Sequence, residues 1–123
     1  MPKSTVPAGT NLAVLVGTLS REPELRSLPS GDTVLALEVT VHPPGGAGES
    51  APITWFAAPA RAAAWLVGEE LLVIGRIRRR FFRAGGATQS RTEVVAARVV
   101  PIRSGAACHK ALTAALDPLR LEL

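Results

Sequence analysis

The sequence contains a single cysteine, Cys108, and this scarcity excludes two classes of structure. One thiol cannot form an intramolecular disulfide, and it cannot supply the cysteine cluster of a zinc or iron–sulfur site. His42 and His109 lie far apart and have no partners at the spacing of metal ligands. We therefore expect neither a metal nor a cofactor, and we interpret Cys108 as a small buried or half-buried residue.

Long apolar runs, a secretion signal and catalytic motifs are missing as well. No apolar stretch is long enough to span a bilayer, and residues 1–7 lack the apolar core of a signal peptide. We expect a cytoplasmic, nucleoid-associated chain without membrane contact. The sequence has no Ser-His-Asp set, no paired carboxylates and no phosphate-binding glycine loop with its lysine. These absences predict a binding protein and not an enzyme.

Aromatic residues are few, and acidic residues are nearly missing from one region. The 123 residues include two Trp, three Phe and no Tyr. Between Arg76 and Arg103 there are eight Arg and one acid, Glu93, so this region carries a charge of +7 while the whole chain carries +4. Such asymmetry indicates a basic patch that binds a polyanion. A preference for Arg over Lys also fits a GC-rich genome, so function alone does not explain it.

The segment Gly75–Phe82 is the most informative part of the basic region. It has the composition of a β-strand, in which successive side chains point to opposite faces. One face would carry Arg76, Arg78, Arg80 and Phe82, and the other would carry Ile77, Arg79 and Phe81. A row of guanidinium groups that ends in an aromatic ring suits single-stranded nucleic acid. The alternative is a solvated edge strand, in which Arg only prevents pairing with other chains.

The rest of the chain predicts an all-β domain. Strands are expected over residues 11–19, 33–41, 53–57, 71–82 and 89–102, with a short helix over 59–67. Gly17 indicates a bulge or a close backbone approach, residues 21–26 a charged connector, and residues 42–52 a long loop. Five strands with one helix between the third and fourth predict a Greek-key OB-fold barrel; a generic α+β domain is the alternative. We expect a flexible arm over 1–10, the barrel over 11–103, and a short tail over 104–123 with a helical turn near 107–116.

Several segments, taken in order, resemble the bacterial single-stranded-DNA-binding proteins. The resemblance extends over residues 11–102 and rests on the combined order and spacing of short motifs, because each motif is weak alone. These motifs are Asn11–Leu19 with the turn Arg21–Arg26, then Pro29-Ser30-Gly31 with Val34 and Ala36, then Thr54-Trp55, Gly75–Phe82 and Arg91–Ala96.

The resemblance implies sequence-nonspecific binding of single-stranded DNA in replication, recombination or repair. Phosphates would contact arginines, and bases would stack on aromatic rings. The candidate contact residues are Arg26, Trp55, Phe56, Arg76, Arg78, Arg80, Phe82, Arg83 and Arg91. Trp55 could also be a core residue, and the resemblance favours the DNA-facing position. Trp65 is expected to pack at the barrel end. Family members associate through the first strand, so we expect a homo-oligomer, either a tetramer or a dimer.

Two departures from the family pattern favour a second interpretation. The segment between Trp55 and Gly68 is short, and the given sequence stops at Pro118–Leu123 without the acidic, Pro-Phe-ended tip that recruits repair enzymes. We therefore expect no tip-dependent recruitment. The alternative function is a protein-interaction OB module, a paralogue with weak DNA binding that associates with another replication or recombination protein.

Overall fold

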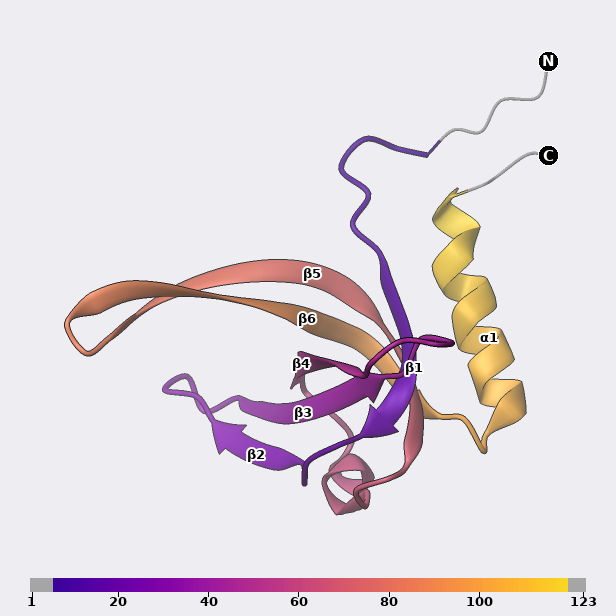
Figure 1. Ribbon diagram of the computed structural model, residues 1–123, viewed down its shortest axis with the longest axis horizontal. Helices are drawn as coiled ribbons and strands as arrows, with labels where there is room; N and C mark the ends of the chain where they lie inside the picture. Colours follow the sequence, from indigo (N-terminus) through magenta and orange to yellow (C-terminus); the bar gives the residue numbers. More distant parts are fainter. Residues whose placement is uncertain (1–5, 120–123) are drawn as a thin grey trace.

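The computed structural model describes residues 6–119, so the ends of the predicted arm and tail, residues 1–5 and 120–123, lie outside the described residues. Six strands, two 3-10 turns and one α-helix follow one another along the described chain (Figure 1). They are β1 (Ala13–Leu19), β2 (Glu24–Ser27), β3 (Thr33–Val41), β4 (Glu49–Phe56), η1 (Ala60–Ala64), β5 (Glu70–Ala84), β6 (Ala87–Pro101), α1 (Gly105–Leu116) and η2 (Asp117–Leu119).

Five of the strands close into a barrel. Their order is β1-β5-β6-β4-β3, and β1 returns to pair with β3 through Thr18 opposite Thr40 and Leu19 opposite Val39. The β4–β6 pair is parallel, with Ile53 opposite Val94, and the other pairs are antiparallel. Closure with one parallel pair is the Greek-key OB-fold that the sequence predicts.

Alternation along β3 and β4 supplies several of the side chains that fill the barrel. On β3 and β4, the opposed residues Leu35 and Trp55 and the opposed residues Leu37 and Ile53 point inward. Such alternation follows from the period-2 geometry of a strand with one buried face. The buried core residues are Leu19, Leu35, Leu37, Val39, Ile53, Trp55, Ala62, Leu71, Val73, Val94 and Val99.

Three segments differ from the sequence-based expectation. The long loop predicted over residues 42–52 contains the first half of β4, which begins at Glu49 and pairs with β3. The charged connector predicted over residues 21–26 contains the exposed strand β2, which pairs with β3 from Glu24 opposite Ala36 to Ser27 opposite Thr33. The α-helix predicted over residues 59–67 is only the 3-10 turn η1. A 3-10 turn aligns residues three apart. It therefore places Ala62, which is fully buried, and Trp65, which is partly buried, on the same side, where both pack against the core at the barrel end.

The α-helix found within residues 6–119 follows the last strand. α1 runs alongside the barrel (Figure 1) and covers a second apolar cluster formed by Leu72, Ile74 and Val100 on the outer face of β5 and β6. Its own apolar side chains recur at the helical spacing that gives one buried stripe. They are Ala107, Cys108, Ala111 and Ala115. No helix among the described residues is long and apolar enough to cross a membrane.

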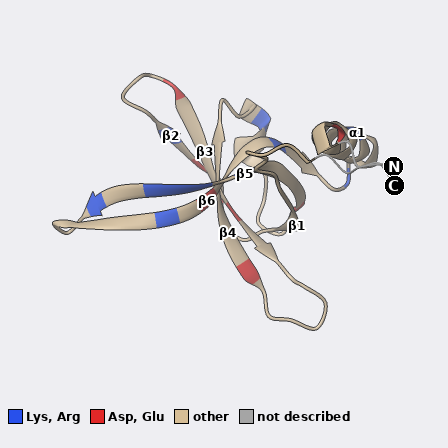
Figure 2. Ribbon diagram, turned by 90° about the horizontal axis from the view of Figure 1, so that it is seen from above, with Lys and Arg blue, Asp and Glu red and all other residues tan. Residues whose placement is uncertain are grey.

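The hairpin of β5 and β6 extends beyond the barrel as an arm. Each strand has 15 residues, and their distal halves project away from the other strands in Figure 1. In Figure 2 the same arm carries Lys or Arg on both strands. The arm begins near a bulge, because Ile74 pairs with Arg98 while Gly75 pairs with Ala96, which leaves Ala97 without a partner in the ladder.

Gly17 marks a close backbone approach, as its position within an apolar strand predicts. A Cβ atom at this residue would overlap the Thr40 carbonyl group and the Val39 side chain, where β1 closes the barrel against β3. Backbone atoms of a closed ladder cannot move aside cheaply. A side chain at Gly17 would therefore strain the closing pair.

We expect Gly17→Ala to lower the free energy of unfolding by roughly 1–3 kcal/mol, the usual cost of overpacking. The matched control is Gly105→Ala at the start of α1. A Cβ atom there meets nothing within 4 Å, and Ala has a higher helix propensity than Gly. Urea denaturation followed by circular dichroism measures both. Equal midpoints for the two variants would contradict this account of barrel closure.

Candidate nucleic-acid interface

The register of β5 against β6 gives the hairpin two distinct faces. On one face Arg78 is opposite Glu93, Arg80 is opposite Arg91, and Phe82 is opposite Gln89. We call the surface formed by Arg76, Arg78, Arg80, Phe82, Gln89, Arg91 and Glu93 the arginine face. The other face carries Ile77, Arg79 and Phe81, and Arg79 donates a hydrogen bond to Ser90 there. This division is the one predicted from strand alternation.

Glu93 organises the centre of the arginine face. Its side chain is 2% exposed, and Arg78 Nη2 lies 2.5 Å from Glu93 Oε2 while Arg80 Nε lies 3.5 Å from Glu93 Oε1. The Thr54 hydroxyl on β4 also favours the charged carboxylate and so lowers the pKa of Glu93. A buried carboxylate requires such partners because its desolvation is otherwise costly. The contact therefore fixes the directions of two arginines and connects three strands.

The protonation of Glu93 reflects these opposing influences. Burial by itself raises the pKa of this carboxyl group, because it disfavours the charged form. Hydrogen bonds from Arg78 and Thr54, together with the charges of Arg78 and Arg80, act in the other direction, so that the pKa is lowered overall. Glu93 is thus a carboxylate at neutral pH, and it offsets one of the positive charges on this face.

Arginine–aromatic pairs line the interface. The Arg78 guanidinium lies 5.7 Å from the centre of the Phe56 ring, and the Arg80 guanidinium lies 5.7 Å from the centre of Phe82. Phe56 is 41% exposed and Phe82 is 36% exposed, so each ring keeps accessible surface. On the opposite face of the arm Arg79 lies over Phe81 at 5.6 Å. Rings and guanidinium planes both provide surfaces on which bases can stack.

Two cations stand directly opposite each other on the arginine face. Arg80 and Arg91 are cross-strand partners, and like charges in this position destabilise a sheet. Arg80 shares Glu93 with Arg78, whereas the structure gives Arg91 no ion pair among residues 6–119. A bound phosphate between these two guanidinium groups would relieve their repulsion.

The remaining predicted contacts lie around this centre. Arg76 is at the base of the arm, near Asn11 and α1 residue Ala115. Arg83 is at the tip, where it donates a 2.9 Å hydrogen bond to the Gly86 carbonyl. Arg91 and Arg26 line one narrow cleft of about 80 Å³. The structure thus brings Phe56, Arg78, Arg80 and Arg91 together and leaves Arg76 and Arg83 at the two ends.

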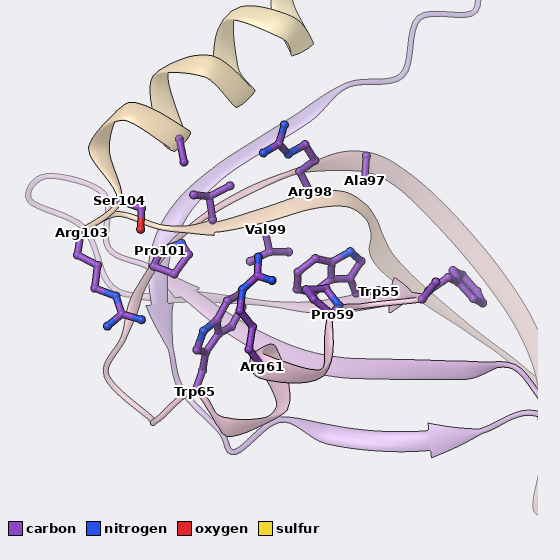
Figure 3. A pocket seen from close by; sticks show the side chains of 14 residues that line it. Trp55, Pro59, Arg61, Trp65, Ala97, Arg98, Val99, Pro101, Arg103 and Ser104 are labelled. Atoms are coloured by element: carbon purple, nitrogen blue, oxygen red, sulfur yellow. The ribbon is translucent and has the colours of Figure 1, made fainter.

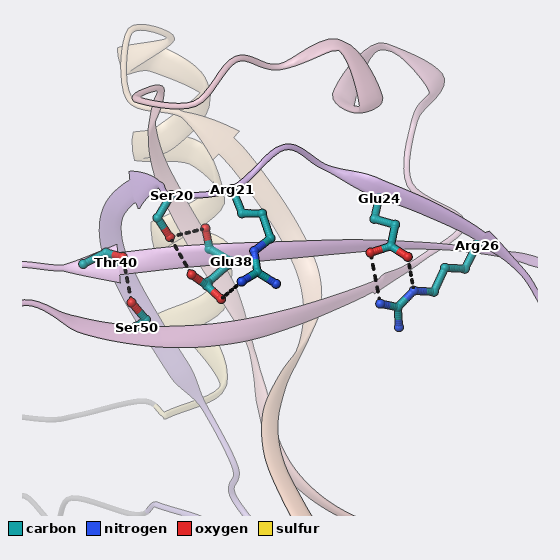
Figure 4. A network of polar contacts seen from close by, with 7 residues as sticks. All are labelled: Ser20, Arg21, Glu24, Arg26, Glu38, Thr40 and Ser50. Atoms are coloured by element: carbon teal, nitrogen blue, oxygen red, sulfur yellow. Dashed lines mark hydrogen bonds and ion pairs between the residues drawn. The ribbon is translucent and has the colours of Figure 1, made fainter.

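Arg26 differs from the other candidates because a carboxylate already engages it. Its Nε and Nη2 atoms donate hydrogen bonds of 3.0 and 3.2 Å to the Glu24 carboxylate (Figure 4). These hydrogen bonds lower the pKa of Glu24 and raise the pKa of Arg26. Arg21 and Glu38 form a longer ion pair of 4.0 Å beside them. The β2–β3 side of the interface is therefore charge-balanced, and the net positive charge lies on the arm.

The resemblance implies that Trp55 faces outward, toward DNA, but in the structure it faces the barrel core. It is 8% exposed and belongs to the barrel core, where its ring stacks on Trp65 with 5.9 Å between centroids. Strand alternation explains the difference: Trp55 shares the inward face of β4 with Ile53, and Phe56 takes the outward face with Thr54. The sequence contains this signal, since Ile53 and Trp55 are two residues apart. The structure supports the core interpretation of Trp55.

The comparisons with known proteins agree on one family. The model of the single-strand binding protein family matches residues 10–102. Among solved structures, the wild-type single-stranded DNA binding protein from Thermus aquaticus is similar, with 28% sequence identity and a TM-score of 0.61. That similarity covers 75% of this chain and 40% of the Thermus aquaticus chain. No curated protein sequence matches.

The depressed pKa of Glu93 predicts a pH dependence of stability. A carboxyl group whose pKa is lower in the folded chain stabilises the fold above its unfolded pKa of about 4.3, and that contribution disappears as the pH falls through the folded value. We expect Glu93→Gln to lower the free energy of unfolding at pH 7 by about 1–3 kcal/mol, because the ion pairs are removed. The gap between wild type and variant should shrink below about pH 4.

Urea unfolding at several pH values from 7 to 3 measures this gap. All other carboxyl groups are common to both proteins, so the difference isolates Glu93. Denaturation curves that stay equally far apart down to pH 3 would contradict the proposed ionisation.

Proposed function

The chain belongs to the single-strand binding protein family, and from that membership we propose that it binds single-stranded DNA without sequence preference through its arginine face. Replication, recombination or repair of DNA would be the setting, as the resemblance implies. The chain matches less than half the length of the Thermus aquaticus protein, so this proposal concerns the OB-fold domain.

The observation that carries the proposal is the opposed pair Arg80 and Arg91. A sheet that serves only as scaffold would avoid two cations in directly opposite positions. A phosphate group that bridges them gains charge-assisted hydrogen bonds from both guanidinium groups. Arg76 and Arg83 extend this electrostatic track toward the base and the tip of the arm.

Base stacking is the second part of the proposal. Phe56 and Phe82 are exposed on the same side as the opposed arginines, and each has a guanidinium group nearby. Stacking on an aromatic ring contributes about 1–3 kcal/mol per base and tolerates every base. Fewer rings than arginines on this face suggest binding with a strong dependence on salt.

The track predicts a separation between two kinds of substitution. We expect Arg80→Ala and Arg91→Ala to weaken binding of oligo-dT and to flatten the slope of log K against log salt by about 0.7 for each phosphate that is no longer neutralised. Phe82→Ala should weaken binding with little change in slope, because stacking releases few counterions. Fluorescence anisotropy of labelled oligo-dT over a series of salt concentrations measures both effects.

Arg79→Ala is the matched control, since Arg79 lies on the same strand but on the opposite face. It should bind nearly as well as the wild type. An equal weakening for Arg79 and Arg80 would mean that the arginine face is not the contact surface. Failure of the folded wild type to bind oligo-dT at low salt would leave the protein-interaction module as the better interpretation.

We also propose that the chain forms a homo-oligomer, a tetramer by family resemblance, through the outer face of β1. Val14 and Val16 on this face are 39% and 51% exposed. Their ladder partners Ile74 and Leu72 are covered by α1, so the apolar surface continues from a covered part to an open part. A second copy that packs on β1 would bury the open part.

We expect wild-type protein to have the mass of a tetramer by light scattering at micromolar concentration, and Val16→Asp to reduce that mass, because a buried unpaired charge opposes association. Leu25→Asp is the matched control, since Leu25 is 62% exposed on β2, which pairs with β3 and not with β1. A monomeric wild type would refute the oligomer, and equal dissociation by both variants would refute the assigned surface.

A further inference from the structure

A cleft at the barrel end contains both tryptophans and three arginines. It opens between the end of β4, the turn η1 and the last part of β6, and its volume is about 470 Å³. The charged residues that line it are Arg61, Arg98 and Arg103, and no Asp or Glu is among its lining residues. Figure 3 shows these arginines around the same opening as Trp55 and Trp65.

We propose that this cleft is a binding site for one nucleotide, with the base on Trp65 and the phosphate on Arg61 and Arg98. The proposal deepens the proposed function, because the nucleotide would belong to the bound single strand. It gives Trp65 a role in ligand binding, whereas the sequence predicts only that Trp65 packs at the barrel end.

The Trp65 ring lines the cleft and is stacked on Trp55. The two ring centroids are 5.9 Å apart, and the ring planes meet at 25°. Trp65 is only partly buried against the core, whereas Trp55 is within it. Trp55 thus acts as a rigid support that fixes the orientation of Trp65, and a supported ring loses little freedom when a base stacks on it.

The electrostatics select an anionic ligand. Arg103 forms an ion pair with Glu69, with 3.3 Å between Arg103 Nη2 and Glu69 Oε1. Arg61 and Arg98 have no ion pair among the described residues. Guanidinium groups recognise phosphate oxygens through charge-assisted hydrogen bonds. A flat apolar surface beside unpaired guanidinium groups matches a base with its phosphate, and the volume lies within the range of small-molecule sites.

The cleft also connects to the arginine face. Phe56 lines the cleft, and the same ring lies beneath the Arg78 guanidinium on the arginine face. A strand that follows the arm toward the barrel therefore reaches Phe56 and then the cleft. The site extends the proposed binding track by a nucleotide.

The backbone at the cleft carries local strain. Ala57, which also lines the cleft, has a φ angle of 52°, a conformation that costs free energy for a residue with a Cβ atom. This residue turns the chain out of β4 toward Pro59 and Arg61. Strain of this kind is common where a fold positions side chains for binding.

The two tryptophans are the only ones in the sequence, so intrinsic fluorescence reports on this cleft alone. We expect oligo-dT to quench this fluorescence. Arg61→Ala/Arg98→Ala should abolish most of the quenching, bind several-fold more weakly and flatten the salt slope by about 0.7 for each phosphate that is no longer neutralised. Arg21→Ala/Arg79→Ala removes the same charge away from the cleft and should retain wild-type quenching.

Two further measurements keep the inference falsifiable. Trp65→Leu should weaken oligo-dT binding roughly 10-fold by anisotropy, as removal of one stacked base does. Millimolar dTMP should quench the wild type, and inorganic phosphate at the same concentration should not. Equal quenching by phosphate would reduce the cleft to a general anion site and overturn the proposal.

The outcome is separable from that of the proposed function. If wild type binds oligo-dT and the double variant Arg61→Ala/Arg98→Ala binds and is quenched equally well, the cleft is not a nucleotide site while the arginine face remains. If wild type binds no oligo-dT, the function itself fails.

Discussion

The outer surface of this protein depends on the burial of one carboxylate, Glu93. Its side chain lies where β4, β5 and β6 meet, one residue before the parallel pairing of β6 with β4 begins at Val94. A buried charge at this position requires cationic partners, and Arg78 and Arg80 supply them. Their orientation in turn sets where Phe56 and Phe82 meet a guanidinium group. The one acid in a strongly basic region thus orders its neighbours as well as offsetting their charge.

The ion pairs with Glu93 order the arginine side chains but lower the net positive charge of the arginine face. A mobile arginine loses side-chain entropy when it binds a phosphate, and an arginine already held by Glu93 loses less. The long-range attraction for an anion is weaker, however, because Glu93 cancels part of the positive charge. Arg78 is held in place by Glu93. Arg91, which is opposite Arg80, has no ion pair among residues 6–119. The surface therefore combines ordered cations with unpaired ones, in a protein that has few aromatic rings to contribute.

Much of the fold follows from the sequence, because strand alternation and turn residues are local signals. They give the barrel, the two faces of β5 and the close approach at Gly17. Local signals misplace the helix, since Pro59 and the alanines after it suit a helix while packing of Ala62 and Trp65 requires a tighter turn. Resemblance places Trp55 outward although its spacing from Ile53 indicates the core. The role of Glu93 and the cleft at Trp65 depend on residues from separate strands, which only the tertiary structure brings together.

The projecting hairpin can open locally, whereas the barrel unfolds as one cooperative unit. Outward from the pair Arg79 and Thr92, the side chains of the arm are largely exposed to solvent. Opening of the Gly85-Gly86 tip therefore breaks ladder hydrogen bonds without exposing the core, so amide protons there exchange through local opening while those of the barrel require global unfolding. The segment that carries the most charge is thus able to adjust its shape at little cost to the fold that supports it.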